Sequence, residues 1–245
     1  MGNQSQKLKK ILVFSAHPDD HLCCAGTLMW LKTKGFEIHE IVATGGEKGP
    51  WWISEKTQRV GFSQKDLKKE RKKEIDKASK IIGINRISFL GLSDGEITIQ
   101  TEIIEKIMKL VRRERPTIVF TTSPKDYHRD HRQLGKIVLE AVNQASWSFR
   151  FELGKPYRVP TVLFMEGFYF GEAHLVVDIT PFAERKRALM ETYKSQIPPR
   201  EKKLLESMNF YRAFLMRNER VWEAEAFEIP ENFPIHLNQL IEIFT

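Results

Sequence analysis

The stretch that decides the fold is Ile11-Leu12-Val13-Phe14-Ser15-Ala16-His17-Pro18-Asp19-Asp20. Its first four residues are apolar, which is typical of a buried strand, and histidine and aspartate follow where that strand should end. A second stretch has the same plan, because the apolar run 117–122 precedes Asp126-Tyr127-His128-Arg129-Asp130-His131. Together the two stretches supply histidine and aspartate to one centre, as in a hydrolytic zinc site with an open coordination position. The sequence therefore predicts an enzyme.

Strands and helices alternate along the first 145 residues. The strand-like runs are 11–16, 37–43, 86–90 and 118–122, and the helical stretches are 22–34, 64–82, 101–115 and 133–145. Gly35 and Gly83 stand where helices should end, and Pro116 prevents the third helix from continuing. This alternation predicts an α/β fold with a mostly parallel, doubly wound sheet flanked by helices.

The order of the strands decides whether the two polar stretches meet. In a doubly wound sheet the first strand commonly lies between the second and the fourth, and ligands bind where the winding reverses. His17 and Asp20 follow the first strand, whereas His128 and His131 follow the fourth. We therefore expect these side chains to meet at the carboxyl ends of two adjacent strands.

The second half of the chain has weaker patterns. Residues 160–166 and 174–179 are strand-like, a helix should run from Pro181 toward Tyr193, and the charged tail from Pro198 has a partial helical stripe. We predict a single domain over residues 1–245 with a C-terminal helical extension from about residue 181. A long loop is expected at 45–63, and loops of that length are often functional.

Composition narrows the class of protein. The chain has 245 residues, 41% of them hydrophobic, and a net charge of +7. No apolar stretch approaches the roughly 20 residues that cross a bilayer, and residues 1–6 lack the apolar core of a secretory signal. A cytoplasmic protein without a transmembrane segment is therefore expected. The basic residues come without an aromatic platform or zinc-finger spacing, so no nucleic-acid partner is predicted.

Catalytic zinc sites use three protein ligands and a water molecule. The ligands that we assign are His17, Asp20 and His131. Asp19 is then left beside the metal as the general base, and since zinc brings bound water to a pKa of about 7, this residue need only accept the proton as attack begins. His128 is left to hydrogen-bond or protonate the oxyanion, and Asp130 is expected to orient its ring.

Each stretch also has a purely structural explanation. Asp19 and Asp20 suit the cap of a helix that begins near Leu22, and His128 and His131 suit the exposed start of another helix. Because both stretches stand at strand ends that the expected topology brings together, the catalytic interpretation is favoured.

The two stretches together resemble the LmbE/PIG-L family of zinc-dependent N-deacetylases. Weaker likeness lies in Thr44-Gly45-Gly46-Glu47-Lys48-Gly49, Arg71-Lys72-Lys73-Glu74, Phe89-Leu90-Gly91-Leu92-Ser93-Asp94-Gly95, Tyr193-Lys194-Ser195-Gln196 and Glu225-Ala226-Phe227. The resemblance covers most of the chain and is vaguer from 145 to 175. It implies a Rossmann-like fold, removal of acetyl groups from N-acetylglucosaminyl compounds, and the metal, base and oxyanion roles assigned above.

The same resemblance implies that Arg71 and Asp94 contact the sugar. Both also have a structural explanation, since Arg71 suits a surface pair with Glu74 and Asp94-Gly95 is a good turn dipeptide. One departure from the family pattern is His21, where many relatives carry glutamate, so we expect a change in the groups around the metal ligands. The form Asp-Tyr-His-x-Asp-His resembles the branch that contains archaeal diacetylchitobiose deacetylases.

The leading hypothesis is hydrolysis of the acetamide of a small N-acetylated amino sugar, with Zn²⁺ or another divalent metal. One alternative is an amidase that acts on a larger sugar conjugate. Another is a non-catalytic sugar- or nucleotide-binding domain, which the free carboxylate of Asp19 and the lack of Gly-x-Gly-x-x-Gly after the first strand both disfavour. Trp51 and Trp52 either stack on a sugar, cover the site, or pack at the subunit contact of a homo-oligomer.

Overall fold

The computed structural model describes residues 9–48, 63–167 and 169–235. Within these ranges the strands are β1 (Lys10–Ser15), β2 (Glu37–Thr44), β3 (Arg86–Leu92), β4 (Ile118–Thr122), β5 (Thr161–Met165), β6 (Leu175–Asp178) and β7 (Ala224–Glu228). The α-helices are α1 (Ala25–Thr33), α3 (Gln64–Ile82), α4 (Thr101–Glu114), α5 (Arg129–Ala145), α6 (Ala183–Met190) and α7 (Pro199–Leu215). The described strands form one sheet.

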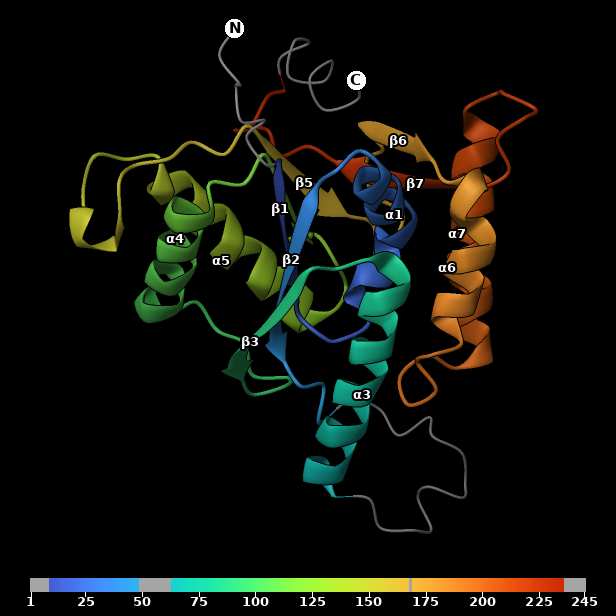
Figure 1. Cartoon of the computed structure of the whole chain (residues 1–245), viewed down its shortest axis with the longest axis horizontal. Helices are drawn as coiled ribbons and strands as arrows, with labels where there is room; N and C mark the ends of the chain where they lie inside the picture. Colours follow the sequence, from blue (N-terminus) through green and yellow to red (C-terminus); the bar gives the residue numbers. More distant parts are fainter. Residues whose placement is uncertain (1–8, 49–62, 168, 236–245) are drawn as a thin grey trace, which may run out of the picture.

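The sheet has the order β3-β2-β1-β4-β5-β7-β6 (Figure 1). β1 runs parallel to both β2 and β4, whereas β7 runs antiparallel to β5 and β6. The predicted place of the first strand between the second and the fourth is confirmed, and so is the mostly parallel α/β class. The prediction of a single domain over residues 1–245 stays a prediction, which this continuous sheet supports.

Helices cover both faces of the sheet. On one face α4 and α5 pack against Leu12 and Phe14, and on the other α1, α3, α6 and α7 enclose Ile11 and Val13. Successive residues of a strand point to opposite faces, so a strand that is covered on both sides must be apolar throughout. This explains why the apolar run at the start of the chain forms the centre of the sheet and carries polar residues only beyond its end.

Several predicted boundaries differ from the observed ones for local reasons. The helix expected at 22–34 is divided into a 3-10 turn, Asp20–Cys23, and α1. The helix expected from residue 133 begins at Arg129, because His128 caps it. The sequence reading missed β7, whose two glutamates are buried and paired with Lys186 and Lys125. Their charges made a buried strand look like part of a solvated tail.

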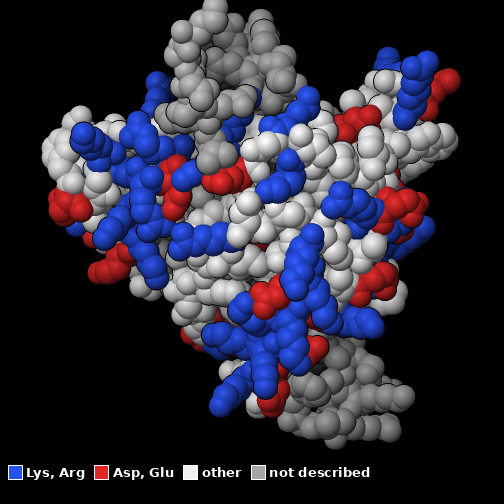
Figure 2. Space-filling model, viewed as in Figure 1, with Lys and Arg blue, Asp and Glu red and all other residues white. Residues whose placement is uncertain are grey.

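Basic side chains gather on part of the surface. Figure 2 shows Lys and Arg clustered over the region where α3 lies in Figure 1. Acidic residues interleave there, and Lys72 contacts Asp76 at 2.7 Å while Lys73 contacts Glu70 at 2.8 Å. These i,i+4 and i,i+3 pairs are typical of a solvated helix face. The absence of a nucleic-acid partner stays a prediction.

Two further predictions concern membranes and the long loop. None of the helices in the described part of the chain is both long and apolar enough to cross a membrane. The cytoplasmic location stays a prediction. Most of the loop expected at 45–63, with Trp51 and Trp52, lies outside the described residues.

Candidate active site and metal centre

The three side chains predicted as metal ligands meet where β1 and β4 end side by side. His17 Nδ1 lies 3.2 Å from His131 Nε2, and Asp20 Oδ1 lies 3.1 Å from the same nitrogen. The remaining separation, from Asp20 Oδ1 to His17 Nδ1, is 3.6 Å. The register of β1 beside β4 therefore brings together residues that are more than one hundred positions apart in the sequence.

These separations suit a tetrahedral ion. Zinc with nitrogen and oxygen ligands at about 2.0–2.1 Å places neighbouring ligand atoms about 3.3 Å apart. Two imidazoles and one carboxylate form a borderline donor set of the kind zinc binds, and only one open side is needed for a water molecule or a substrate. His17, Asp20 and His131 could hold such an ion without rearrangement of the backbone.

Asp20 is fixed by the backbone at the end of β1. Its Oδ2 accepts hydrogen bonds from the backbone N–H groups of Ala16, at 2.6 Å, and His17, at 3.0 Å. Its Oδ1 is thereby turned toward His131. Asp19 precedes the 3-10 turn but makes no side-chain capping bond. The capping explanation of the aspartate pair therefore fails for Asp19, whose carboxylate is left for another role.

A carboxylate supports each histidine of the triangle from its far side. His131 Nδ1 lies 3.0 Å from Asp126 Oδ2, which also fixes the ring orientation. His17 Nε2 lies 3.2 Å from Asp94 Oδ1 and 3.6 Å from Asp130 Oδ2. A carboxylate behind a metal-binding histidine is a common arrangement, because it selects the tautomer and makes the other nitrogen more basic.

The charges of the site follow from these contacts. Burial lowers the pKa of His131, but Asp20 and Asp126 raise it, and the result is about 9. Metal binding needs the neutral imidazole, so an ion there competes with a proton. Burial raises the pKa of Asp19, and the neighbouring Asp20 charge raises it further. A carboxyl group with a raised pKa is a stronger proton acceptor, as a general base requires.

His128 borders the triangle and begins α5. Its ring centroid lies 4.8 Å from that of His17 and 4.8 Å from that of His131. Its Nδ1 accepts a hydrogen bond of 3.2 Å from the backbone N–H of Asp130. Burial and the neighbouring histidines lower its pKa, which favours the neutral ring. With Nδ1 acting as acceptor, the single proton of that ring resides on Nε2.

The structure differs from the prediction in how Asp130 meets His128. Its carboxylate accepts from the backbone N–H groups of Gly95, at 2.7 Å, and Ile97, at 3.4 Å. The contact with the His128 ring is made by the backbone N–H of Asp130 instead. The carboxylate thus ties the loop after β3 to the start of α5 and lies behind His17.

The two predicted sugar contacts are placed at the site but are not free. Arg71 is 4% exposed, and its guanidinium donates to the backbone carbonyls of Gly46 and Ser195. The alternative of a surface pair with Glu74 is wrong, because both residues are buried. Asp94 Oδ2 accepts from the Lys48 backbone N–H at 2.6 Å. Its other oxygen lies beside His17, a contact that the sequence reading did not foresee.

Comparison with known proteins gives the family. The model of the PIG-L family, GlcNAc-PI de-N-acetylase, matches residues 12–142. The chain belongs to this family. It is 30% identical to the diacetylchitobiose deacetylase of Thermococcus kodakarensis over 204 residues, which cover 78% of this chain and 71% of the relative.

Two other relatives of this PIG-L protein bear on its activity. The mycothiol S-conjugate amidase of Streptomyces coelicolor is 26% identical, over 65% of this chain and 61% of the relative. The solved structure of N,N'-diacetylchitobiose deacetylase from Pyrococcus horikoshii aligns with a TM-score of 0.80 and 25% identity, over 95% of this chain and 87% of that one. The predicted family, fold and enzyme class are confirmed: the chain is a hydrolytic N-deacetylase.

Sequence reasoning missed the roles of two residues beside this PIG-L site, Asp126 and Gly167. Asp126 stands in the second stretch, five residues before His131, and its spacing was the only available signal. Gly167 follows β5, and a Cβ there would lie 2.5 Å from Asp126 Oδ2. The loop after β5 therefore packs directly against the carboxylate behind His131, which requires a residue without a side chain.

Proposed function

We propose that this chain removes the N-acetyl group from an N-acetylglucosaminyl compound, with zinc held by His17, Asp20 and His131. The observation that carries the proposal is the triangle of three ligand atoms, 3.1–3.6 Å apart, beside a carboxylate without a capping role. The sugar class is supported by the diacetylchitobiose deacetylase that is 30% identical to this chain.

The chemistry divides between the ion and the protein. Zinc bound there would polarise the amide carbonyl and lower the pKa of a water ligand to about 7. Asp19 accepts the proton of the attacking water and passes it to the leaving amine. Burial of Asp19 favours this, because a desolvated carboxylate takes up a proton more readily.

His128 stabilises the negative charge that develops on the carbonyl oxygen. Its Nδ1 accepts from the Asp130 backbone, so its Nε2 carries the proton and is the hydrogen-bond donor. A fixed donor aimed at a developing oxyanion is a large contribution to catalysis. Asp130 acts in this proposal as a positioning residue, through its backbone on His128 and through its carboxylate behind His17.

Arg71 and Asp94 are proposed to bind sugar hydroxyls. The Arg71 guanidinium donates to two backbone carbonyls, and its Nε has no partner among the described residues. Asp94 lies beside His17 and offers a carboxylate at the edge of the metal triangle. A site that hydrogen-bonds hydroxyls discriminates strongly against substrates that lack them. The partner is therefore a small amino sugar rather than an acetylated protein.

A second candidate is cleavage of a larger amide on a sugar conjugate. The relative named mycothiol S-conjugate amidase favours it, since the same site accepts either acyl group if the space beside the carbonyl allows. The size of the acyl group that is released separates the two candidates.

A substrate panel tests the proposal. Purified protein with zinc is incubated with N-acetylglucosamine, diacetylchitobiose, the inositol and malate glycosides of N-acetylglucosamine, and an acetyl-lysine peptide, and released acetate is measured. We expect acetate from at least one sugar and very little from the peptide. Equal cleavage of the peptide would refute the sugar-recognition claim, and acetate from none of the substrates would refute the deacetylase claim.

A further inference from the structure

A buried chain of side chains leads from β2 to the loop that carries His17 and Asp19. Glu40, His21 and Tyr193 are each fully buried. The Glu40 carboxylate lies 2.9 Å from His21 Nδ1, and His21 Nε2 lies 2.6 Å from the Tyr193 hydroxyl. That hydroxyl lies 3.0 Å from the backbone carbonyl of Pro18. This hydrogen-bonded series therefore ends on Pro18, the one residue between His17 and Asp19.

The hydrogen bonds at the two ends of this series have a fixed direction. The Pro18 carbonyl is only an acceptor, so the Tyr193 hydroxyl donates to it, and the same hydroxyl oxygen contacts His21 Nε2. The Glu40 carboxylate is likewise an acceptor, so His21 Nδ1 donates to it, and the Ser15 hydroxyl donates to it as well at 2.7 Å. Each group then has a partner, which is the arrangement that makes a buried polar network rigid.

The segment that carries Tyr193 also holds the other side of the site. The Ser195 carbonyl accepts from Arg71, while the Ser195 backbone N–H and hydroxyl donate to Glu74 at 2.8 and 2.6 Å. The connection between α6 and α7 is thus joined both to the loop of the metal ligands and to α3. A shift of this segment would move Asp19 relative to Arg71.

We propose that Tyr193, oriented by His21 and Glu40, is a positioning residue that fixes the Pro18 carbonyl. It thereby sets where the Asp19 carboxylate stands relative to the metal ligands His17 and Asp20. The catalytic meaning of this inference rests on the proposed deacetylase function. The structural part of the inference is that the Tyr193 hydroxyl fixes the geometry of the metal ligands. This part does not depend on which amide is cleaved.

Tyr193→Phe tests the inference, because it removes the hydroxyl and keeps the ring that packs in the core. We expect one metal ion per chain as in the wild type, a kcat lower by at least about tenfold, and a KM within about twofold, since small misplacement of a catalytic group costs turnover. With cobalt in place of zinc, the visible absorption spectrum should shift and the metal should dissociate faster.

Tyr157→Phe is the matched control. The Tyr157 hydroxyl also donates to a backbone carbonyl, that of Pro116, at 2.9 Å, but at the amino end of β4 and away from the site. It should lower the melting temperature without changing kcat or the cobalt spectrum. If Tyr193→Phe behaves like this control, Tyr193 is only a structural residue and the inference is wrong.

Glu40→Gln, alone and combined with Tyr193→Phe, tests whether Glu40 and Tyr193 are coupled. If Glu40 acts through Tyr193, the double variant should lose no more kcat than the greater of the two single variants. If the two substitutions lower kcat independently, so that their effects multiply in the double variant, Glu40 does not act through Tyr193. The cobalt spectrum and the metal dissociation rate need no substrate, so they still decide the inference if no sugar is deacetylated and the proposed function fails.

Discussion

Two adjacent aspartates in this PIG-L protein have opposite surroundings. Burial raises the pKa of Asp20, but His131 and His17 more than offset this and hold it well below its usual range. Burial raises the pKa of Asp19, and the Asp20 charge adds to the rise. A pair of carboxylates with pKa values moved apart is typical of acid–base sites, where one member stays ionised and the other exchanges a proton.

Asp19→Asn separates the base from the ligands. We expect this variant to keep its metal and to lose turnover by about 10²- to 10⁴-fold, because the amide cannot accept the proton of the attacking water. Metal analysis and kinetics on the same sample provide the check. If the variant loses its metal, Asp19 is a ligand and the roles of Asp19 and Asp20 are exchanged.

Asp126→Asn tests the carboxylate behind His131. The asparagine amide makes a weaker hydrogen bond to His131 Nδ1 than the carboxylate does. Metal affinity should therefore fall by about 10- to 100-fold, the usual effect of losing such a partner. Competition with a coloured chelator measures the affinity, and Asp76→Asn, at a half-exposed position on α3, serves as control. An unchanged affinity in Asp126→Asn would show that His131 needs no support from this carboxylate.

The sequence was sufficient to predict the metal ligands, but not the contacts that hold those ligands in place. His17, Asp20 and His131 are found from residue type and strand order. The contact of Asp94 with His17 depends on how the loop after β3 folds over the end of β1, which no local pattern specifies. The same holds for Gly167 against Asp126, since these residues meet only after β4 and β5 have paired.

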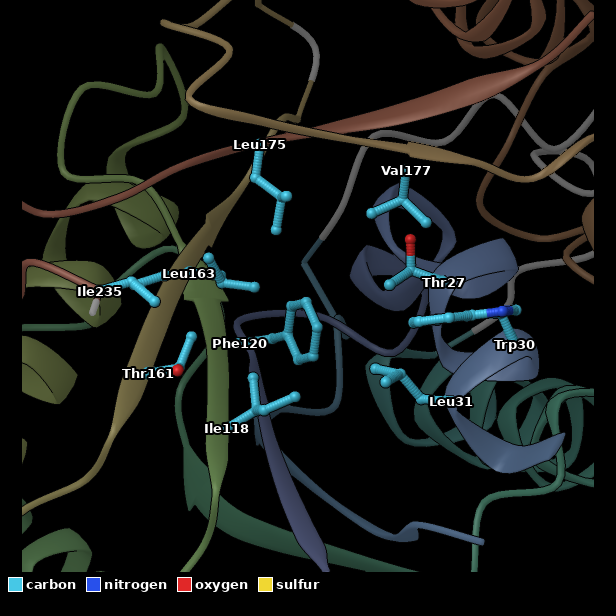
Figure 3. Close-up of a pocket in the computed structure, with 10 residues that line it drawn as sticks. All are labelled: Thr27, Trp30, Leu31, Ile118, Phe120, Thr161, Leu163, Leu175, Val177 and Ile235. Atoms are coloured by element: carbon cyan, nitrogen blue, oxygen red, sulfur yellow. The ribbon is translucent and has the colours of Figure 1, made fainter. Parts of the chain in front are cut away.

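At the scale of elements, an apolar pocket lies between α1 and the strands β4, β5 and β6. Figure 3 shows ten residues that line it, among them Thr27 from α1 and Thr161 from β5. Both hydroxyls are buried and have no partner among the described residues. An unpaired buried hydroxyl costs free energy on folding, so this packing layer is less stable than an apolar one would be.

Thr161→Val should therefore raise the free energy of unfolding by about 1 kcal/mol, since it removes an unpaired hydroxyl and keeps the β-branched shape. Thr122→Val is the control. The Thr122 hydroxyl donates to the His131 carbonyl at 2.9 Å, so this variant should be destabilised. Urea unfolding of both variants provides the measurement, and a destabilised Thr161→Val would mean that its hydroxyl has a partner.

Elements were predicted best where the pattern is local. α3 and β4 have the predicted bounds, because a capping box at Ser63 and Gly83 at the other end delimit the helix and apolar residues fill the strand. β7 was missed because Glu225 is buried against Lys186 and against the backbone N–H groups at the start of α1. Such pairing is made by distant elements and leaves no periodic signal.

At the scale of the whole molecule, the strand order makes the site. β1 lies between β2 and β4. The two polar stretches, which follow β1 and β4, therefore lie side by side at the carboxyl ends of these strands. This arrangement was predictable, because alternating strands and helices restrict the topology to a few forms. The positions of α6 and α7 on one face and of β7 between β5 and β6 were not predictable, since the sequences of these elements lack the apolar runs that mark central strands.

The most direct test of the central claim is to measure bound zinc and released acetate on the same protein samples. We predict about one zinc per chain in the active wild type. Both zinc and activity should be lost on chelation and restored on adding zinc, and both should be lost in His131→Ala. Full acetate release from protein without metal, or full zinc content in His131→Ala, would contradict the account.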